Sequence, residues 1–60
     1  MSKEKITADL EEAKELVALY ASLGRAYMNM GLRAKAYQKR SEAIAQQSRV
    51  LNLESLLKAI

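Results

Sequence analysis

Few side chains in this sequence have the chemistry that catalysis or metal binding requires. Its 60 residues include no Cys and no His, so the commonest nucleophile, general base and metal ligands are missing. The one cluster of carboxylates is Glu11, Glu12 and Glu15. Carboxylates act as an acid/base pair only where a pocket perturbs one of them, and these stand near the start of a predicted helix, where they favour the helix dipole and solubility. We therefore expect a non-enzymatic protein without a cofactor or a metal site.

The basic side chains are concentrated in the second part of the chain. Residues 25–60 hold seven basic and two acidic residues, a net charge of +5, whereas residues 1–24 hold three basic and five acidic residues, a net charge of −2. A basic helix can bind nucleic acid through its phosphates, and this is our alternative hypothesis for the function. These charges point around most of the predicted helix, however, which favours a solvated face that also pairs with the acidic first part.

Two long polar residues, Arg40 and Gln47, fall between the apolar columns of the second predicted helix. One interpretation is a polar layer in an interface, which fixes the register of a partner or contacts its carboxylate. The other is that their methylene groups cover the edge of the core while the polar ends stay in water. The sequence leaves both interpretations open.

The elements that position these residues are predicted to be helices. Strong helix formers dominate and β-branched residues are few, so the fold class is all-α. Thr7 is a plausible N-cap for a helix over about 7–30, and Gly31 a plausible left-handed terminator. A second helix then follows over about 33–51, and the short connection makes the pair an antiparallel hairpin. Apolar or small residues recur in the first helix with alternating spacings of four and three, at positions 6, 10, 13, 17, 20, 24 and 27.

The core side of the second helix is less regular. We expect it to comprise Ala36, Tyr37, Ala43, Ile44, Val50 and Leu51. After this set the apolar direction turns by roughly half a circle, to Leu53, Leu56, Leu57 and Ile60. Residues 53–60 therefore form either a short third helix, which could fold back and complete a monomeric bundle, or an extension of the second helix.

The first helix has more apolar surface than one neighbour can cover. Beside its main stripe lies a second, and together they span about 200° of arc, against about 100° for an ordinary surface helix. The second stripe comprises Leu16, Leu19, Leu23 and Met30. Met30 and its neighbour Met28 suit either gap filling in a core or an adaptable binding surface. We expect the extra surface to be covered by residues 53–60, by a second copy of the chain or by another protein.

Seven residues of the hairpin stand at fixed offsets along the chain: Tyr20, Leu23, Gly24, Tyr27, Gly31, Ala36 and Ala43. With these residues the hairpin resembles a single tetratricopeptide repeat over about residues 17–50. The sequence departs from that pattern at Arg40, where an aromatic residue is expected, and at Ser48, where proline is expected. The resemblance implies close helix crossing at Gly24 and Ala36 and a role in protein binding. Because stacked arrays need about three repeats to bury a continuous core, a single repeat implies an edge fragment or an oligomer.

Taken together, the sequence predicts one small helical domain over residues 1–60, a hairpin with the C-terminal segment described above. We expect a protein–protein interaction module, or accessory and regulatory protein, that self-associates. The candidate partner-binding residues are Leu16, Leu19, Leu23, Met30, Arg40 and Gln47. The longest apolar run, Leu16 to Ala21, is far below the roughly 20 residues that span a bilayer, so we expect no membrane segment and a cytoplasmic location. The short chain beginning with Met suggests a complete gene product of bacterial or phage type.

Overall fold

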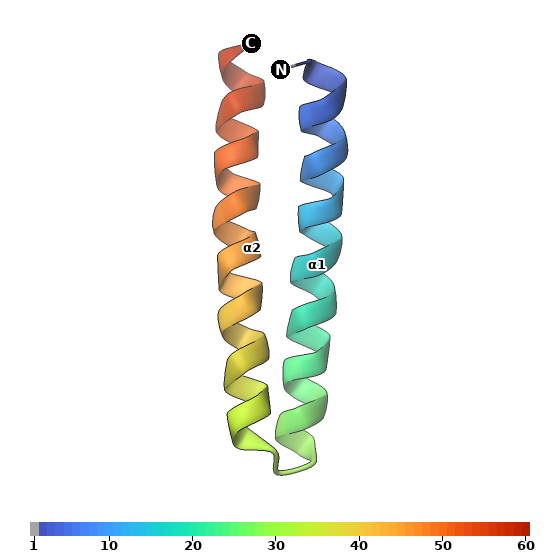
Figure 1. Ribbon diagram of the computed structural model, residues 1–60, viewed down its shortest axis with the longest axis vertical. Helices are drawn as coiled ribbons and strands as arrows, with labels where there is room; N and C mark the ends of the chain where they lie inside the picture. Colours follow the sequence, from blue (N-terminus) through green and yellow to red (C-terminus); the bar gives the residue numbers. More distant parts are fainter. Residues whose placement is uncertain (1) are drawn as a thin grey trace.

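The computed structural model describes residues 2–60 and consists of two antiparallel helices of equal length. Helix α1 spans Lys3–Asn29 and helix α2 spans Arg33–Ala59, each with 27 residues. The hairpin is a rod with extents of 45 × 14 × 12 Å. The described N-terminal residues and the C-terminus lie at one end and the connecting loop at the other (Figure 1). The all-α hairpin predicted from the sequence is confirmed.

Helix α1 begins earlier than the sequence suggested. The Ser2 side chain accepts a hydrogen bond from the backbone N–H of Lys5 at 3.1 Å, and Ser2 has extended backbone angles, as an N-cap requires. The Thr7 hydroxyl instead donates to the carbonyl of Lys3 at 2.9 Å, inside the helix. The prediction of an N-cap at Thr7 was therefore wrong, because Ser2 offers a cap that adds a full turn, including Ile6, to the packed helix.

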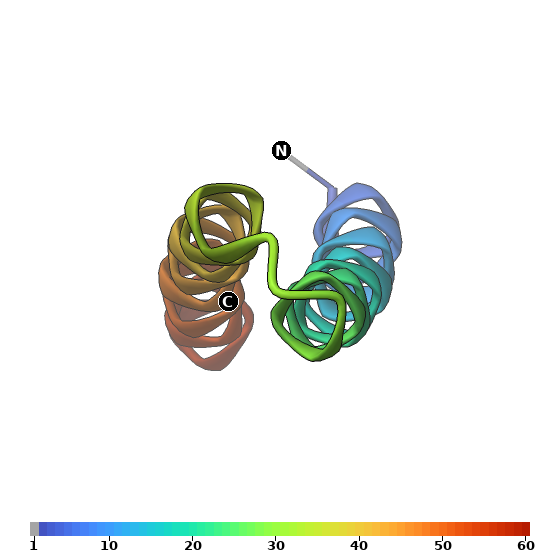
Figure 2. The same cartoon turned by 90° about the horizontal axis from the view of Figure 1, so that it is seen from below.

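The end of α1 and the loop agree with the prediction for Gly31. Gly31 has φ of 78°, the left-handed conformation that favours glycine. The Leu32 N–H donates to the Tyr27 carbonyl at 2.9 Å and the Gly31 N–H to the Met28 carbonyl at 3.0 Å. This is the bond pattern of a Schellman C-cap, and it turns the chain directly into α2 (Figure 2).

The two helices meet along one regular seam. On α1 the buried and half-buried positions of the seam are 6, 10, 13, 17, 20, 24 and 27, the set predicted from the sequence. On α2 they are 36, 39, 43, 46, 50, 53 and 57. Both sets alternate between spacings of three and four, which is the pattern of helices packed as in a coiled coil. Among the described residues, the cluster of buried hydrophobic side chains lies near the termini and contains Ile6, Leu10, Ala13, Val50 and Leu53, with Val17 and Leu57 packed against it.

The predicted core side of α2 was partly wrong. Ala36 and Val50 are buried and Ala43 is half-buried, but Tyr37, Ile44 and Leu51 are 55%, 67% and 57% exposed. The seam instead takes in Lys39, Gln46, Leu53 and Leu57, none of which belongs to the predicted set. The small residues Ala36 and Ala43 let the backbones approach, which the larger Tyr37 and Ile44 would prevent.

The C-terminal segment extends α2 and is no separate third helix. Residues 53–59 continue the helix, and Leu53 and Leu57 pack against the N-terminal turns of α1. Of the two predicted alternatives the extension is observed, so residues 53–60 do not cover the extra apolar surface as a folded-back lid. Within residues 2–60, neither helix has a stretch apolar enough to cross a membrane.

Candidate functional site

The half of the hairpin near the loop is held together by a close helix approach. Gly24 and Ala36 are the buried residues there, and a Cβ placed on Gly24 would lie 3.5 Å from the carbonyl oxygen of Ala36. It would also lie 3.4 Å from Cγ of Arg40, so the aliphatic part of Arg40 lies over Gly24. The predicted crossing at two small residues is confirmed.

One side of this crossing carries two lysine–tyrosine contacts. The Nζ atom of Lys39 lies 5.5 Å from the ring centroid of Tyr20, and that of Lys35 lies 5.9 Å from the ring centroid of Tyr27. Lys39 also donates a hydrogen bond to Glu42 at 3.1 Å. This bond is the main reason that the pKa of Lys39 is raised above its ordinary value, with desolvation acting in the opposite direction. We call this side of the hairpin the tyrosine side.

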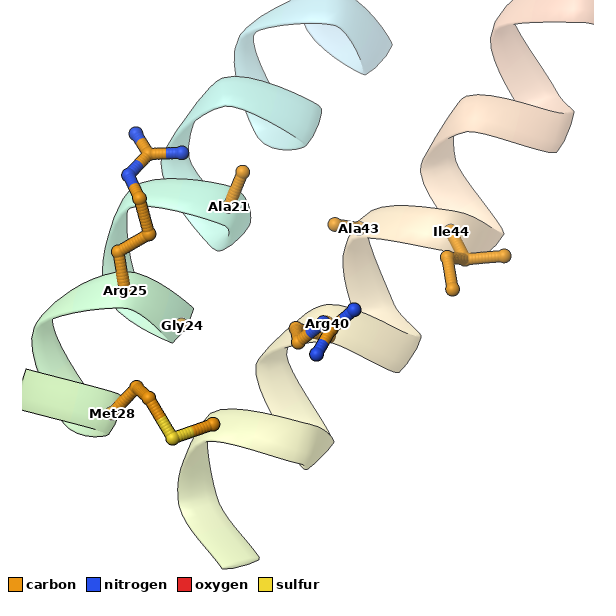
Figure 3. A pocket seen from close by; sticks show the side chains of 7 residues that line it. All are labelled: Ala21, Gly24, Arg25, Met28, Arg40, Ala43 and Ile44. Atoms are coloured by element: carbon orange, nitrogen blue, oxygen red, sulfur yellow. The ribbon is translucent and has the colours of Figure 1, made fainter. Parts of the chain in front are cut away.

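The other side of the crossing is hollowed, and we call it the hollow side. An open hollow of about 370 Å³ lies between the helices. Met28 points from α1 toward α2, while Ile44 points away from α1 (Figure 3). The hollow exists because the seam here contains small residues, which leave space that no side chain of the described residues fills. Its lining residues are Ala21, Gly24, Arg25, Met28, Arg40, Ala43 and Ile44.

A stripe of side chains, all exposed except the half-buried Glu54 at its end, runs along α2 on the hollow side. Its three apolar members, Tyr37, Ile44 and Leu51, are spaced by seven residues and are each more than half exposed. Polar residues separate them at regular helical spacing. We call the whole set the α2 stripe: Arg33, Tyr37, Arg40, Ile44, Gln47, Leu51 and Glu54.

The second apolar stripe predicted on α1 lies on the tyrosine side. Leu16 and Leu23 are three or four residues from Tyr20 and Tyr27, so they share a helix face with these rings and are half-buried. Leu19 and Met30 are 51% and 67% exposed. We call Leu16, Leu19, Leu23 and Met30 the α1 stripe.

The structure therefore does not bring the six candidate partner-binding residues together. Leu16, Leu19, Leu23 and Met30 belong to the tyrosine side, whereas Arg40 and Gln47 belong to the α2 stripe. The sequence reasoning missed Tyr37, Ile44 and Leu51, which it assigned to the core. Their seven-residue spacing, interrupted by Arg40 and Gln47, was the signal that could have identified them as a surface seam.

The carboxylate cluster and the basic residues of α2 are largely surface groups. Glu11, Glu12 and Glu15 are exposed, and Glu12 pairs with Arg49 across the helices at 3.6 Å. Lys35, Lys39 and Arg49 thus each contact another side chain of the hairpin. Arg33, Arg40 and Glu54 form no ion pair with any residue in 2–60.

Comparison of the chain with protein-family models, with curated proteins and with solved structures finds no match. The resemblance to a tetratricopeptide repeat stays a prediction, because a helical hairpin with a close crossing is common to many helical proteins. The case for a function depends on the two stripes.

Proposed function

We propose that this chain is a small, non-enzymatic protein–protein interaction module that self-associates through its exposed apolar stripes. The observation that supports the proposal is the exposure of large apolar side chains on both sides of the hairpin. Leu19, Met30, Tyr37, Ile44 and Leu51 are all at least half exposed, whereas among residues 2–60 only six hydrophobic residues are buried. A chain with so small a core gains stability when another helix covers these side chains.

The free energies of burial and of association favour a partner with an apolar helix surface over a partner with a polar surface. Burying a large apolar side chain that is already half covered contributes about 1 kcal/mol, so three of them contribute about 3 kcal/mol. Association costs an estimated 4 kcal/mol or more in lost freedom of motion. One stripe on a polar surface does not offset that cost, but two stripes that bury each other double the gain. A partner of this module therefore brings apolar helix surface of its own.

The contacts of the basic side chains of α2 favour protein binding over nucleic-acid binding. Lys35, Lys39 and Arg49 contact tyrosine rings or carboxylates within the hairpin, and Arg33 and Arg40 alternate on the α2 stripe with large exposed apolar side chains. A helix that binds phosphates instead carries a run of basic groups on one face, without large apolar side chains between them. An accessory or regulatory role toward a larger partner agrees with the size of the chain and belongs to the same proposal.

Sedimentation velocity over a range of protein concentrations tests the proposal. We expect a mass above the 6.7 kDa of one chain. Substitution of Leu19→Glu or Ile44→Glu places a charge on one stripe each, and at least one of them should return the mass to that of one chain. Glu11→Lys, at an exposed position of α1 that is not three or four residues from any member of either stripe, is the control and should leave the mass unchanged. A single-chain mass at every concentration would contradict self-association.

A further inference from the structure

We propose that the α2 stripe is the surface that binds a second copy of this chain, with the two α2 helices antiparallel and a twofold axis passing beside Ile44. This inference specifies the partner and geometry of the self-association proposed above, and it rests on that proposal. It depends on the spacing of the stripe, on its charges and on the hollow beside it.

The stripe matches itself when its direction is reversed. Its members stand at 33, 37, 40, 44, 47, 51 and 54. If the order is reversed about position 44, position 37 falls on position 51, and positions 40 and 33 fall within one residue of positions 47 and 54. One residue is a shift of about 1.5 Å along a helix, which side chains absorb easily. Tyr37 then meets Leu51 of the second copy, and Ile44 meets Ile44. All three exposed apolar side chains of the stripe are buried by apolar side chains.

The charges select the antiparallel direction. In that arrangement Arg33 lies opposite Glu54 of the second copy, and the guanidinium of Arg40 can donate a hydrogen bond to the amide oxygen of Gln47. A parallel pair would instead place Arg33, Arg40 and Glu54 each beside its own copy, so that like charges meet at three levels. Within residues 2–60, Arg33 and Glu54 have no other ion-pair partner.

Two observations favour the α2 stripe over the α1 stripe as the surface that binds a second copy. The hollow of about 370 Å³ lies at the level of Arg40 to Ile44, next to the proposed axis, and offers space for a side chain of the second copy. On the α1 stripe, by contrast, the two well-exposed members Leu19 and Met30 are eleven residues apart, and Leu23, the stripe member between them, is half-buried. The α2 stripe is therefore the more continuous seam.

Disulfide trapping in the full chain tests both the surface and the direction. The chain has no cysteine, so each single-cysteine variant reports one position. A disulfide forms without backbone movement only when the two Cα atoms are within about 7 Å, so equilibration in a thiol redox buffer selects pairs that are already adjacent. Tyr37→Cys mixed with Leu51→Cys should give the mixed cross-linked dimer in preference to either self-linked dimer. Ile44→Cys should link to itself, and Leu19→Cys, the control on the α1 stripe, should not.

The possible outcomes separate this inference from the function on which it rests. Self-linking of Tyr37→Cys would show a parallel pair, and preferential self-linking of Leu19→Cys would show that the α1 stripe is the contact. Either result would overturn the inference while self-association stands. A single-chain mass in sedimentation together with no cross-linking at any position would overturn both.

Charge reversal gives a test without cysteine. Arg33→Glu and Glu54→Arg each create two pairs of like charges in an antiparallel dimer, and each should weaken association about tenfold. The double variant restores both pairs with exchanged signs and should associate within about threefold of the unchanged chain. Single variants without effect, or a double variant weaker than either single one, would contradict the proposed pairing.

Discussion

The two ends of this hairpin hold the same pair of helices together in different ways. Near the termini, the large side chains of Ile6, Leu10, Val50 and Leu53 are buried in one cluster. Near the loop, the seam contains Gly24 and no large side chain is buried. Close backbone approach, lysine–tyrosine contacts and the covalent loop take the place of a hydrophobic core at that end.

The difference follows from where the chain is closed. At the loop, Gly31 and its neighbours keep the helix ends together at almost no further cost in chain entropy, because the connection is short. At the open end no covalent link joins the last turns of the two helices, so burial of apolar side chains does most to keep them together there. The loop half is thereby able to leave apolar side chains such as Tyr37 and Ile44 exposed.

The largest expected effect distinguishes the terminal core from the exposed stripe. Leu53 is 8% exposed and Leu51, two residues earlier, is 57% exposed. Leu53→Ala removes a core side chain and should lower the free energy of unfolding by about 2–4 kcal/mol, a large share of what so short a chain has. Urea unfolding followed by circular dichroism measures this loss.

Leu51→Ala is the matched control for Leu53→Ala. It should change the stability of the single chain by less than about 0.5 kcal/mol, because it removes surface that is mostly in water. Any larger loss should depend on protein concentration, since it would come from association through the α2 stripe. Equal, concentration-independent losses for the two variants would show that the difference between core and stripe does not hold.

In the loop half, we expect a substitution at Gly31 to lower the free energy of unfolding the most. With φ of 78° and no heavy atom within 4 Å of an added Cβ, the cost of a side chain there comes from the backbone alone. Gly31→Ala should lower the free energy of unfolding by about 1–2 kcal/mol. Gly31→Asn should lower it less, since asparagine tolerates the left-handed region. A loss as large for asparagine as for alanine would contradict a purely backbone cause.

Much of α1 could be predicted from the sequence, because one pattern dominates it. The seam positions from Ile6 to Tyr27 follow a single alternation of four and three, and Gly31 has few roles other than ending a helix. The approach of Gly24 to Ala36 was implied by the resemblance to a tetratricopeptide repeat, and the small size of both residues allows it. Because α1 has a single hydrophobic pattern and a single glycine at its end, its buried face and its C-terminal end can be predicted without knowledge of the helix that packs against it.

Helix α2 could not be predicted as well, because it carries two competing stripes. Tyr37, Ile44 and Leu51 have more apolar surface than Ala36 and Ala43, so hydrophobicity alone favours the wrong set. The choice depends on the other helix: small residues opposite Gly24 allow close approach, and the same seam continues to Leu53 and Leu57. The candidate binding residues were divided between two sides for the same reason, since α2 must be oriented before any shared face is known.

Replacing Gly24 with alanine should raise the free energy of unfolding, whereas the same replacement at Gly31 should lower it. An alanine Cβ there would meet Cγ of Arg40 at 3.4 Å, which a flexible side chain accommodates, and the Ala36 carbonyl oxygen at an ordinary 3.5 Å. Because alanine favours a helix interior over glycine by about 1 kcal/mol, Gly24→Ala should raise the free energy of unfolding by about 0.5–1 kcal/mol. Urea unfolding measures it, and a loss of stability would show that the helices approach too closely there to accept even a methyl group.

The smallest expected effect concerns the ammonium group of Lys39, which links the two helices in the loop half. Its Nζ donates to Glu42 and lies 5.5 Å from the ring centroid of Tyr20. The hydrogen bond to Glu42 raises the pKa of Lys39 above its ordinary value of 10.5, and the negative charge of Glu42, with smaller effects of Tyr27 and Tyr20, acts in the same direction. A raised pKa in the folded chain means that this group contributes stability below pH 10.5, and that the contribution is lost as the pH rises through the folded pKa.

Lys39→Met tests this contribution because it keeps the packing of the aliphatic stem and removes the charge. At neutral pH the variant should unfold at a slightly lower urea concentration than the unchanged chain, and the difference should disappear at strongly alkaline pH. Lys35→Met, which removes a ring contact at Tyr27 and no ion pair described in residues 2–60, is the control for the aromatic part. If the two variants lose the same stability at neutral pH, the lysine–tyrosine contact and not the ion pair with Glu42 accounts for the effect. The loop half would then be stabilised by contacts to tyrosine rings, whereas the terminal half is stabilised by buried leucine and isoleucine side chains.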